Sequence, residues 1–568
     1  MDNPIRKYHY CRLIALITLS LLLAGCATPT IGPTPTPTRT PHPPTPTLTP
    51  TPIPPSPTPT PAFPVTVGCA IGVPADACKR LQTIAAEDGA HFAWIGDGAA
   101  ADIVLDVTET PGVLPAGQWT YALVAPFFTI PDGAPLADLR ATWAGAPEGW
   151  FVERPLLVSA DTRAVFARDW GEPANAVQAI TATHLLTSAQ ALDAWALVPF
   201  HALEPEWKVL HVDGQTPLAR DLDLTAHALT FNLYLSSATR PETLALLNYD
   251  AASFTNRHTD KMTVVVLTGV TAMSRSTARL MENKGITYPA RDILPWFADA
   301  DFVHVSNEVS FTPTCTPAPG GSLVFCSHDR YIELLEAIGA NVVELTGNHL
   351  GDVGRQWIFH TLEMYAERGW GWYGGGADLA DATRPLTLTH NGNRIAFLGC
   401  NPSGTAFFAS ETLPGAAKCT QPDEHALMQG QVEALRAEGY LPIVTLQHRE
   451  VDQYEPWPGH IRDLRAYAAA GAVIVHGSQA HWVKPMEFRH GAFIHYGPGN
   501  LFFDQMWANG VRQGFLTRYT FHDGRLLSIE LQPYIIEEFG RPRPMTDGDP
   551  DPVADRSRFL QMIFALRP

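Results

Sequence analysis

Apolar and polar positions alternate in blocks along most of the chain, and two such stretches stand out. Between Val65 and Leu247, the helical pattern of Cys78–Glu87 is followed by the short apolar runs Ile103–Leu105 and Tyr121–Ala125. Strands that alternate with helices are typical of α/β proteins. The pattern therefore predicts an α/β domain over residues 65–247.

A second α/β domain is predicted over residues 255–540. Met262–Leu267 is apolar except for Thr263, as expected of a buried strand. Further strands are expected at Asp301–Val305, Asn341–Leu345, Leu441–Leu446, Val473–Val475, Phe493–Tyr496 and within Phe515–Tyr534, and helices at Ser276–Lys284, Arg291–Ala298, Tyr331–Gly339, Trp357–Arg368 and Arg462–Ala470. Asn391-Gly392 predicts a hairpin turn within Thr387–Leu398. The Pro- and Asp-rich stretch 540–555 is expected to be exposed, and residues 541–568 to form a C-terminal tail.

The first 64 residues differ from the rest. Residues 1–26 have a basic start and the apolar run Leu13–Leu23, which is short for a membrane span and typical of an export signal. The run ends in Leu23-Ala24-Gly25-Cys26, which resembles the bacterial lipobox and implies a lipidated Cys26 at the membrane outside the cytoplasm. The alternative is an ordinary cleaved signal. Residues 27–64 are mostly Pro and Thr, and we expect a disordered linker with a reach of about 100 Å.

Charge narrows the range of partners. The chain has 568 residues and a formal net charge of −18, and 45% of its residues are hydrophobic. An acidic surface repels phosphate backbones, so the composition disfavours nucleic-acid binding. A cationic ligand, or an anionic one neutralised by metal, remains compatible with it.

Cysteine usage agrees with export. Outside the signal segment, six cysteines form sequence-near pairs, each within one predicted domain: Cys69 and Cys78, Cys315 and Cys326, and Cys400 and Cys419. Six cysteines allow 15 pairings in principle. We expect the local disulfides, because a metal site would favour a Cys-x-x-Cys step, which the chain lacks.

The first domain resembles the phosphate-type solute-binding proteins of ABC importers. The resemblance rests on Tyr121–Pro126, Pro135–Gly145 and Trp195–Phe200. It implies a periplasmic-binding-protein-like domain that binds a small solute. The Ser/Thr/Gly-rich phosphate loops of those proteins are missing near its start, so a scaffold without a ligand is the alternative.

Polar residues follow the predicted strands of the second domain. Glu308 comes after the strand at 301–305, Asn348 and His349 follow 341–345, His448 follows 441–446, and His481 follows 473–475. Open α/β sheets place their ligands at the carboxyl ends of the strands. Imidazole, carboxylate and amide ligands suit Mn, Fe, Zn or Mg, so this pattern predicts a divalent-metal or other polar-ligand site.

The same segments resemble the capsule-synthesis CapA family, the poly-γ-glutamate synthesis accessory proteins, over about residues 262–535. The motifs are Ser306-Asn307-Glu308, Gly347-Asn348-His349 with Asp352 and Gly354, Gly374–Leu379 with Ala382 and Pro385, His448, Gly477–His481 and Tyr496–Asp504. The resemblance implies a four-layer metallophosphoesterase-like sandwich. It also implies a role with an anionic cell-envelope polymer or the capsule machinery.

Carried over residue by residue, the resemblance implies a set of metal ligands: Glu308, Asn348, His349, His448 and His481. His349 and His448 are then the catalytic candidates, with His349 the better acid/base at neutral pH. Arg275 could pair with a carboxylate or phosphate of the substrate.

The chain also departs from the family pattern. Thr268-Gly269-Val270 lacks the Asp that normally ends the first strand, and the usual His-Trp-Gly reads His448-Arg449-Glu450. These departures leave two alternatives open. One is a metal-dependent hydrolase or transferase, and the other is a non-catalytic binding lipoprotein with a degenerate metal site.

Overall fold

A computed structural model of the chain describes residues 64–109, 113–250 and 252–568. The predicted signal, Cys26 and nearly all of the linker lie outside the described residues. The described residues form one compact unit. Within the described part, no helix has the length and apolar character needed to cross a membrane.

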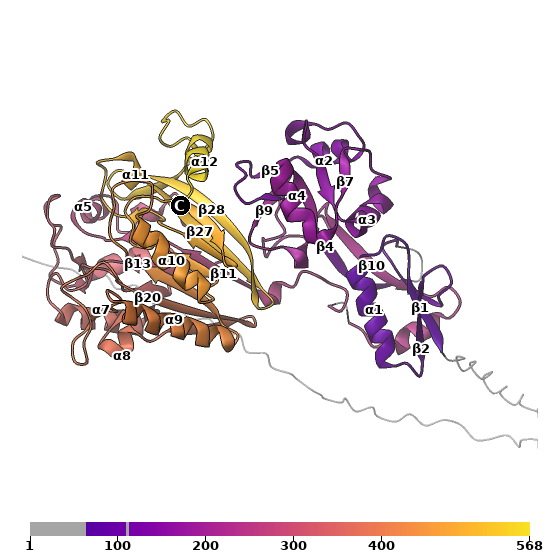
Figure 1. Cartoon of the computed structure of the whole chain (residues 1–568), viewed down its shortest axis with the longest axis horizontal. Coiled ribbons are helices and arrows are strands. Elements are labelled where there is room, and N and C mark those ends of the chain that lie inside the picture. The colour runs from indigo at the N-terminus through magenta and orange to yellow at the C-terminus, as the bar shows by residue number, and fades with distance from the viewer. Residues whose placement is uncertain (1–63, 110–112, 251) are drawn as a thin grey trace, which may run out of the picture. The chain divides into compact units, whose positions relative to one another are not determined.

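The first ten strands pair into a sheet of their own (Figure 1). They are β1 (Val65–Cys69), β2 (Phe92–Asp97), β3 (Ile103–Asp106), β4 (Leu114–Pro126), β5 (Gly133–Ala134), β6 (Leu156–Val158), β7 (Val177–Ala179), β8 (Trp195–Pro199), β9 (Trp207–Val212) and β10 (Thr230–Ser236). Four helices accompany them: α1 (Ala75–Glu87), α2 (Leu136–Trp143), α3 (Ala160–Trp170) and α4 (Leu185–Leu192). The α/β class predicted for this stretch is confirmed.

The remaining strands build two larger sheets and two small pairs. The nine-stranded sheet contains β11 (Met262–Leu267), β12 (Val270–Thr271), β13 (Phe302–Asn307), β16 (Val342–Glu344), β17 (Gly371–Tyr373), β26 (Asn500–Phe502), β27 (Gln513–His522), β28 (Arg525–Glu537) and β29 (Arg541–Pro544). The six-stranded sheet contains β19 (Leu386–His390), β20 (Asn393–Cys400), β22 (Leu441–Leu446), β23 (Ile474–His476), β24 (Met486–Arg489) and β25 (Ala492–His495). The short pairs are β14 (Phe311–Thr312) with β15 (Ser327–His328), and β18 (Gly375–Gly376) with β21 (Gly415–Ala416).

Three apolar clusters define four layers. One joins the nine-stranded sheet to α5 (Arg275–Lys284), α6 (Ile332–Ala337) and α7 (Gln356–Glu367). A second lies between the two sheets and includes Val265 and Ile443, and a third joins the six-stranded sheet to α9 (Pro422–Ala437) and α10 (Pro458–Ala469). Figure 1 shows α9 and α10 in orange beside β20, and β27 and β28 in yellow beside β11. Strands β11, β13, β16 and β17 pair in parallel, as do β20, β22, β23 and β25.

Most predicted elements are present, and two predictions are wrong. Arg291–Ala298 is not an α-helix but contains only a 3-10 turn at Leu294–Trp296, because Pro295 lacks the N–H that a helix interior needs. Residues 540–555 are not uniformly exposed. β29 pairs with β28, and Met545 and Ala554 are buried. Beyond them α12 (Arg556–Ala565) packs into the core between the sheets. The remaining helices, α8 (Leu379–Ala382) and α11 (Asn509–Arg512), are single turns.

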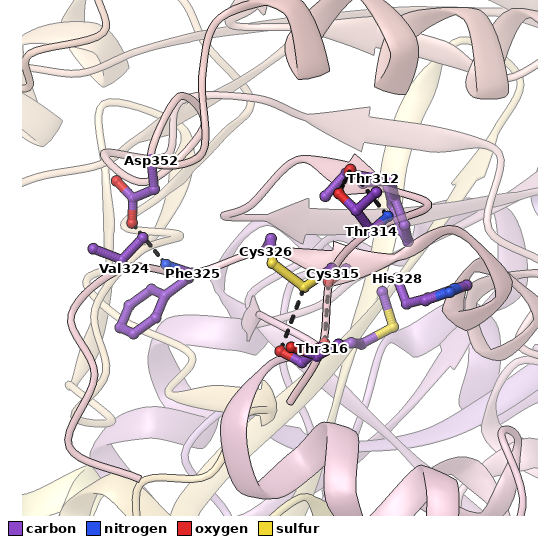
Figure 2. The surroundings of a disulfide bond; sticks show 12 residues. Thr312, Thr314, Cys315, Thr316, Val324, Phe325, Cys326, His328 and Asp352 are labelled. Carbon is purple, nitrogen blue, oxygen red and sulfur yellow. Dashed lines mark hydrogen bonds between the residues drawn. A yellow bond between two sulfur atoms is a disulfide. The ribbon is translucent and has the colours of Figure 1, made fainter. Parts of the chain in front are cut away.

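The three local disulfides are confirmed. Cys69 bonds to Cys78, Cys315 to Cys326, and Cys400 to Cys419. The second of them closes the loop that joins β14 to β15 (Figure 2). The hairpin turn at Asn391-Gly392 has positive φ at both residues, +48° and +77°, as this turn type requires.

Candidate metal-binding site

Glu308 is the residue around which the site is built. It follows β13, and its backbone N–H donates to the carbonyl oxygen of Thr271 in β12 at 3.0 Å. The side chain is fully buried, and neither carboxylate oxygen has a hydrogen-bond partner. Burial therefore raises the pKa of Glu308, although the nearby imidazoles of His481 and His349 oppose this. A buried carboxylate without partners is costly unless a cation balances it.

The backbone around Glu308 is unusually close. A Cβ atom at Gly347 would come within 2.8 Å of the Glu308 Cα atom. Glycine at position 347 therefore allows the loop after β16 to approach the end of β13, and it brings the following residues, Asn348 and His349, to the same edge.

His481 and Glu450 approach Glu308 from the six-stranded sheet. His481 lies after β23, and its Nδ1 is 2.7 Å from the Asn500 Oδ1 acceptor, so Nδ1 carries a proton. Its Nε2 is 3.6 Å from a carboxylate oxygen of Glu450. Burial lowers the pKa of His481, but Glu450 and Glu308 outweigh this and raise it to about 9. Partial burial raises the pKa of Glu450, whose side chain is 45% exposed, but His481 outweighs this and brings the pKa below its usual range.

Glu308, Glu450 and His481 form one group of ligand atoms. One atom from each lies within 4.8 Å of the other two, and no other group of this kind occurs within residues 64–109, 113–250 and 252–568. Two carboxylates and one imidazole suit Mn, Fe or Zn. Because only one of the three ligands is a nitrogen, the set also suits Mg. The orphaned carboxylate of Glu308 and this donor set fit a divalent cation.

His349 borders this group. Its Nδ1 atom is 2.7 Å from Asp352 Oδ2, and this contact does not involve the other ring nitrogen, Nε2. The ring of Phe325 lies 4.2 Å from the His349 ring. Burial lowers the pKa of His349, but Asp352 and Glu308 outweigh it, so that the pKa lies above the usual value. A carboxylate behind a histidine ring fixes its tautomer and orientation, an arrangement common behind metal ligands.

Asn348 and His448 are held by other partners. Asn348 Oδ1 accepts a hydrogen bond from Gln447 Nε2 at 2.7 Å. His448 Nε2 lies 3.0 Å from Asp463 of α10, and its Nδ1 accepts the Arg449 backbone N–H at 2.9 Å. Both nitrogens of His448 are therefore engaged, and the structure does not bring this ring into the group.

Arg275, the first residue of α5, is buried and forms an ion pair with Asp504. Its guanidinium group also donates to the carbonyl oxygen of Ser322 at 3.1 Å. The structure thus places Arg275 among protein partners.

Glu450 is the site residue that the sequence analysis missed. It comes four residues after β22, and we noted it only as a departure from the His-Trp-Gly pattern. A carboxylate two residues after a strand-end histidine was the available signal. Asn500, which fixes the His481 ring, lies at the start of β26, and nothing in its local sequence indicates that contact.

The fold and the site define a layered α/β domain with an acidic and histidine-containing group at the carboxyl ends of its strands. Residues 264–505 match the family model described as "Bacterial capsule synthesis protein PGA_cap". The second half of the chain therefore carries a PGA_cap domain, which confirms the CapA resemblance.

Two curated relatives agree with this match. "PGA biosynthesis protein CapA" of Bacillus subtilis is 27% identical over 287 residues, which is 50% of this chain and 73% of that protein. "Capsule biosynthesis protein CapA" of Bacillus anthracis is 22% identical over 295 residues, 51% of this chain and 71% of that protein.

Solved structures show more distant similarity. The match to an ABC-type phosphate transport receptor from Vibrio cholerae covers 33% of this chain and 95% of the receptor chain, with 14% identity and a TM-score of 0.29. The match to a hypothetical protein from Thermus thermophilus covers 48% of this chain and 100% of that protein's chain, with 15% identity and a TM-score of 0.31.

Proposed function

We propose that this chain is a surface lipoprotein that acts in the synthesis, export or anchoring of an anionic capsule polymer such as poly-γ-glutamate. The observation that carries the proposal is the group of Glu308, Glu450 and His481 at the strand ends of a PGA_cap domain. The names of both Bacillus relatives, which refer to capsule or PGA biosynthesis, support it. The polymer and the capsule machinery are the proposed partners.

Within this proposal, Glu308, Glu450 and His481 hold a divalent ion, with His349 at its border. When bound, such an ion would polarise a substrate oxygen and lower the pKa of a water molecule. The protein contributes orientation. Asn500 and Asp352 engage the Nδ1 atoms of His481 and His349, which directs the two Nε2 atoms away from those partners. His349, with its raised pKa, is the side chain that we assign to proton transfer.

Attachment to the membrane belongs to the same proposal. Lipidation of Cys26 would hold the protein outside the cytoplasm, and the Pro/Thr-rich residues 27–64 would act as the spacer. The acidic net charge of −18 also favours a metal-mediated contact with an anionic polymer over a direct one.

A second candidate is a non-catalytic lipoprotein that binds polymer or solute. The observation in its favour is the end of β11, where Thr268 and Val270 are buried and no carboxylate is present. In this alternative, residues 65–247 bind a small solute, and the PGA_cap domain (residues 255–540 in our division of the chain) keeps a degenerate metal site. Phosphate, glutamate oligomers and muropeptides are the solutes to test by thermal shift.

The proposal is tested with a protein of residues 61–568, which contains the compact unit. We expect about one equivalent of Mn, Fe or Zn by equilibrium dialysis and a large loss in Glu308→Gln. Mn-dependent hydrolysis or transfer on poly-γ-glutamate that disappears in His349→Gln would support the enzymatic form. Metal content at background in both proteins would rule out the metal-dependent form, whereas metal binding without any turnover would favour the second candidate.

A further inference from the structure

Arg275 has an uncommon backbone conformation for a buried cation. Its φ is +47°, in the left-handed region that non-glycine residues seldom adopt. The next backbone N–H, at Ser276, donates to Asp504 Oδ2 at 3.0 Å, while the guanidinium group pairs with Asp504 Oδ1. The side chains of Arg275 and Asp504 are only 9% and 4% exposed. Asp504 therefore contacts both the backbone at the strained start of α5 and the guanidinium charge of Arg275.

The guanidinium group of Arg275 lies over two phenylalanine rings. Its central carbon is 4.6 Å from the ring centre of Phe325 and 5.1 Å from that of Phe503. A cation over an aromatic face is attracted by the ring quadrupole, more strongly where water is excluded. Arg275 thus ties together two rings from segments far apart in the sequence.

Each of these rings lies against an imidazole of the candidate site. Phe325 is 4.2 Å from the His349 ring, and Phe503 is 5.1 Å from the His481 ring, with only 9° between the planes. Both imidazoles therefore pack against rings that share one cation.

The disulfide-closed loop connects to the same unit. Phe325 precedes Cys326, and its backbone N–H donates to Asp352 Oδ2 at 2.9 Å (Figure 2). That carboxylate oxygen also contacts His349 Nδ1. The loop is anchored a second time, where Ser322 accepts a hydrogen bond from Arg275. Hydrogen bonds therefore connect the loop to Asp352 and His349.

We infer that Arg275 and Asp504 are a positioning pair that, through Phe325 and Phe503, sets the ring planes of His349 and His481 in the metal-binding site. This assigns Arg275 a role through other side chains rather than by direct contact with a substrate. The expected effect on metal affinity rests on the proposed function. The ring geometry itself is independent of any metal.

The test compares Arg275→Met and Arg275→Lys with Arg518→Met. Arg518 is a matched control, because its side chain is 12% exposed and pairs with Asp299 at 2.7 Å, near the start of β13 rather than near its end. Imidazole signals of His349 and His481 are followed by NMR in the metal-free compact unit, assigned by His→Gln variants, and Mn affinity is measured by calorimetry.

We expect both imidazole signals to shift in Arg275→Met, less so in Arg275→Lys, and to stay in place in Arg518→Met. Mn affinity should fall by about tenfold or more in Arg275→Met only, the usual effect of losing an outer residue that orients ligands. Unchanged imidazole signals in Arg275→Met, or equal shifts in Arg518→Met, would overturn the inference. Absent Mn binding in the wild type would count against the proposed metal site, and the NMR result would still decide the positioning role.

Discussion

Two fully buried carboxylates on neighbouring strands provide a paired test of the site. Glu308 follows β13 and has no hydrogen-bond partner, whereas Glu344 ends β16 and accepts hydrogen bonds from Ser478 and, at 2.6 Å, from Thr346. His304 Nε2 lies 3.3 Å from the other oxygen of Glu344. Burial raises the pKa of both groups, but the partners of Glu344 outweigh it and bring its pKa below the usual value, while that of Glu308 stays raised.

The opposite pKa shifts predict opposite effects on stability. In metal-free protein at pH 7.5, Glu308→Gln should raise the free energy of unfolding by about 1.4 kcal/mol for each unit by which burial raises the pKa of Glu308, because the amide carries no charge. Glu344→Gln should lower it by about 3 kcal/mol, because removing one partner of a buried pair leaves the other uncompensated.

The pH dependence separates the two carboxylates further. The folded-state pKa of Glu308 is raised above the unfolded value near 4.5. The folded protein therefore bears no penalty from Glu308 below pH 4.5 and loses stability as the pH rises through the folded-state pKa. For Glu344 the folded-state pKa is lowered, so its stabilising contribution exists above 4.5 and disappears as the pH falls. The advantage of Glu308→Gln should therefore shrink on acidification, and so should the defect of Glu344→Gln.

Added metal should shift the comparison towards the wild type and offset the advantage of Glu308→Gln. A ligand at 100 times its Kd stabilises the folded state by about 2.7 kcal/mol, which only the wild type and Glu344→Gln should gain from Mn. Urea unfolding with EDTA and with Mn measures all three proteins. A metal-free Glu308→Gln protein that is less stable than wild type would refute the reasoning, because it would mean that the carboxylate is already compensated.

Three further predictions follow from single positions. Burial lowers the pKa of His495 to about 3, whereas this side chain titrates near 6.5 in the unfolded chain. The free energy of unfolding should therefore fall as the pH drops below 6.5, by about 2 kcal/mol at pH 5. Urea unfolding of His495→Gln should show a smaller loss over the same pH range. Gly347→Ala would force a Cβ atom within 2.8 Å of the Glu308 Cα atom and should weaken Mn binding in calorimetry, whereas Gly392→Ala, with open space around its Cα, should alter only stability. Cys26→Ala should move the full-length protein from the membrane fraction to the medium or periplasm on immunoblots, and retention at the membrane would contradict lipidation.

The strand pattern of the second domain could be predicted well because its strands are buried on both faces. Leu441–Leu446 is a strand with the predicted bounds, and so is Met262–Leu267, since mostly apolar runs of this length are typical of strands that are covered on both faces. The helix expected at Arg291–Ala298 failed on local chemistry that the sequence does contain, namely Pro295.

The candidate site was predictable by position and less so by partner. Strand-end placement brought Glu308 and His481 together, as expected of parallel sheets, but His448 is engaged by Asp463, which lies on a helix fifteen residues away. Such a contact depends on how α10 packs, and the local pattern around His448 does not encode it. Whether His448 takes part in metal binding stays a prediction.

Glu450 changes what the missing first-strand Asp means. With Thr268-Gly269-Val270 at the end of β11, a ligand set drawn only from the family pattern would contain Glu308 as its single carboxylate. The observed group has two carboxylates, because Glu450 approaches from the six-stranded sheet, and it lies 3.6 Å from His481. Below a pH of about 9 the protonated His481 ring pairs with Glu450, while the carboxylate of Glu308 has no hydrogen-bond partner, and a cation must displace that proton to bind. The acidic character of the site is therefore retained by a residue on a different strand end.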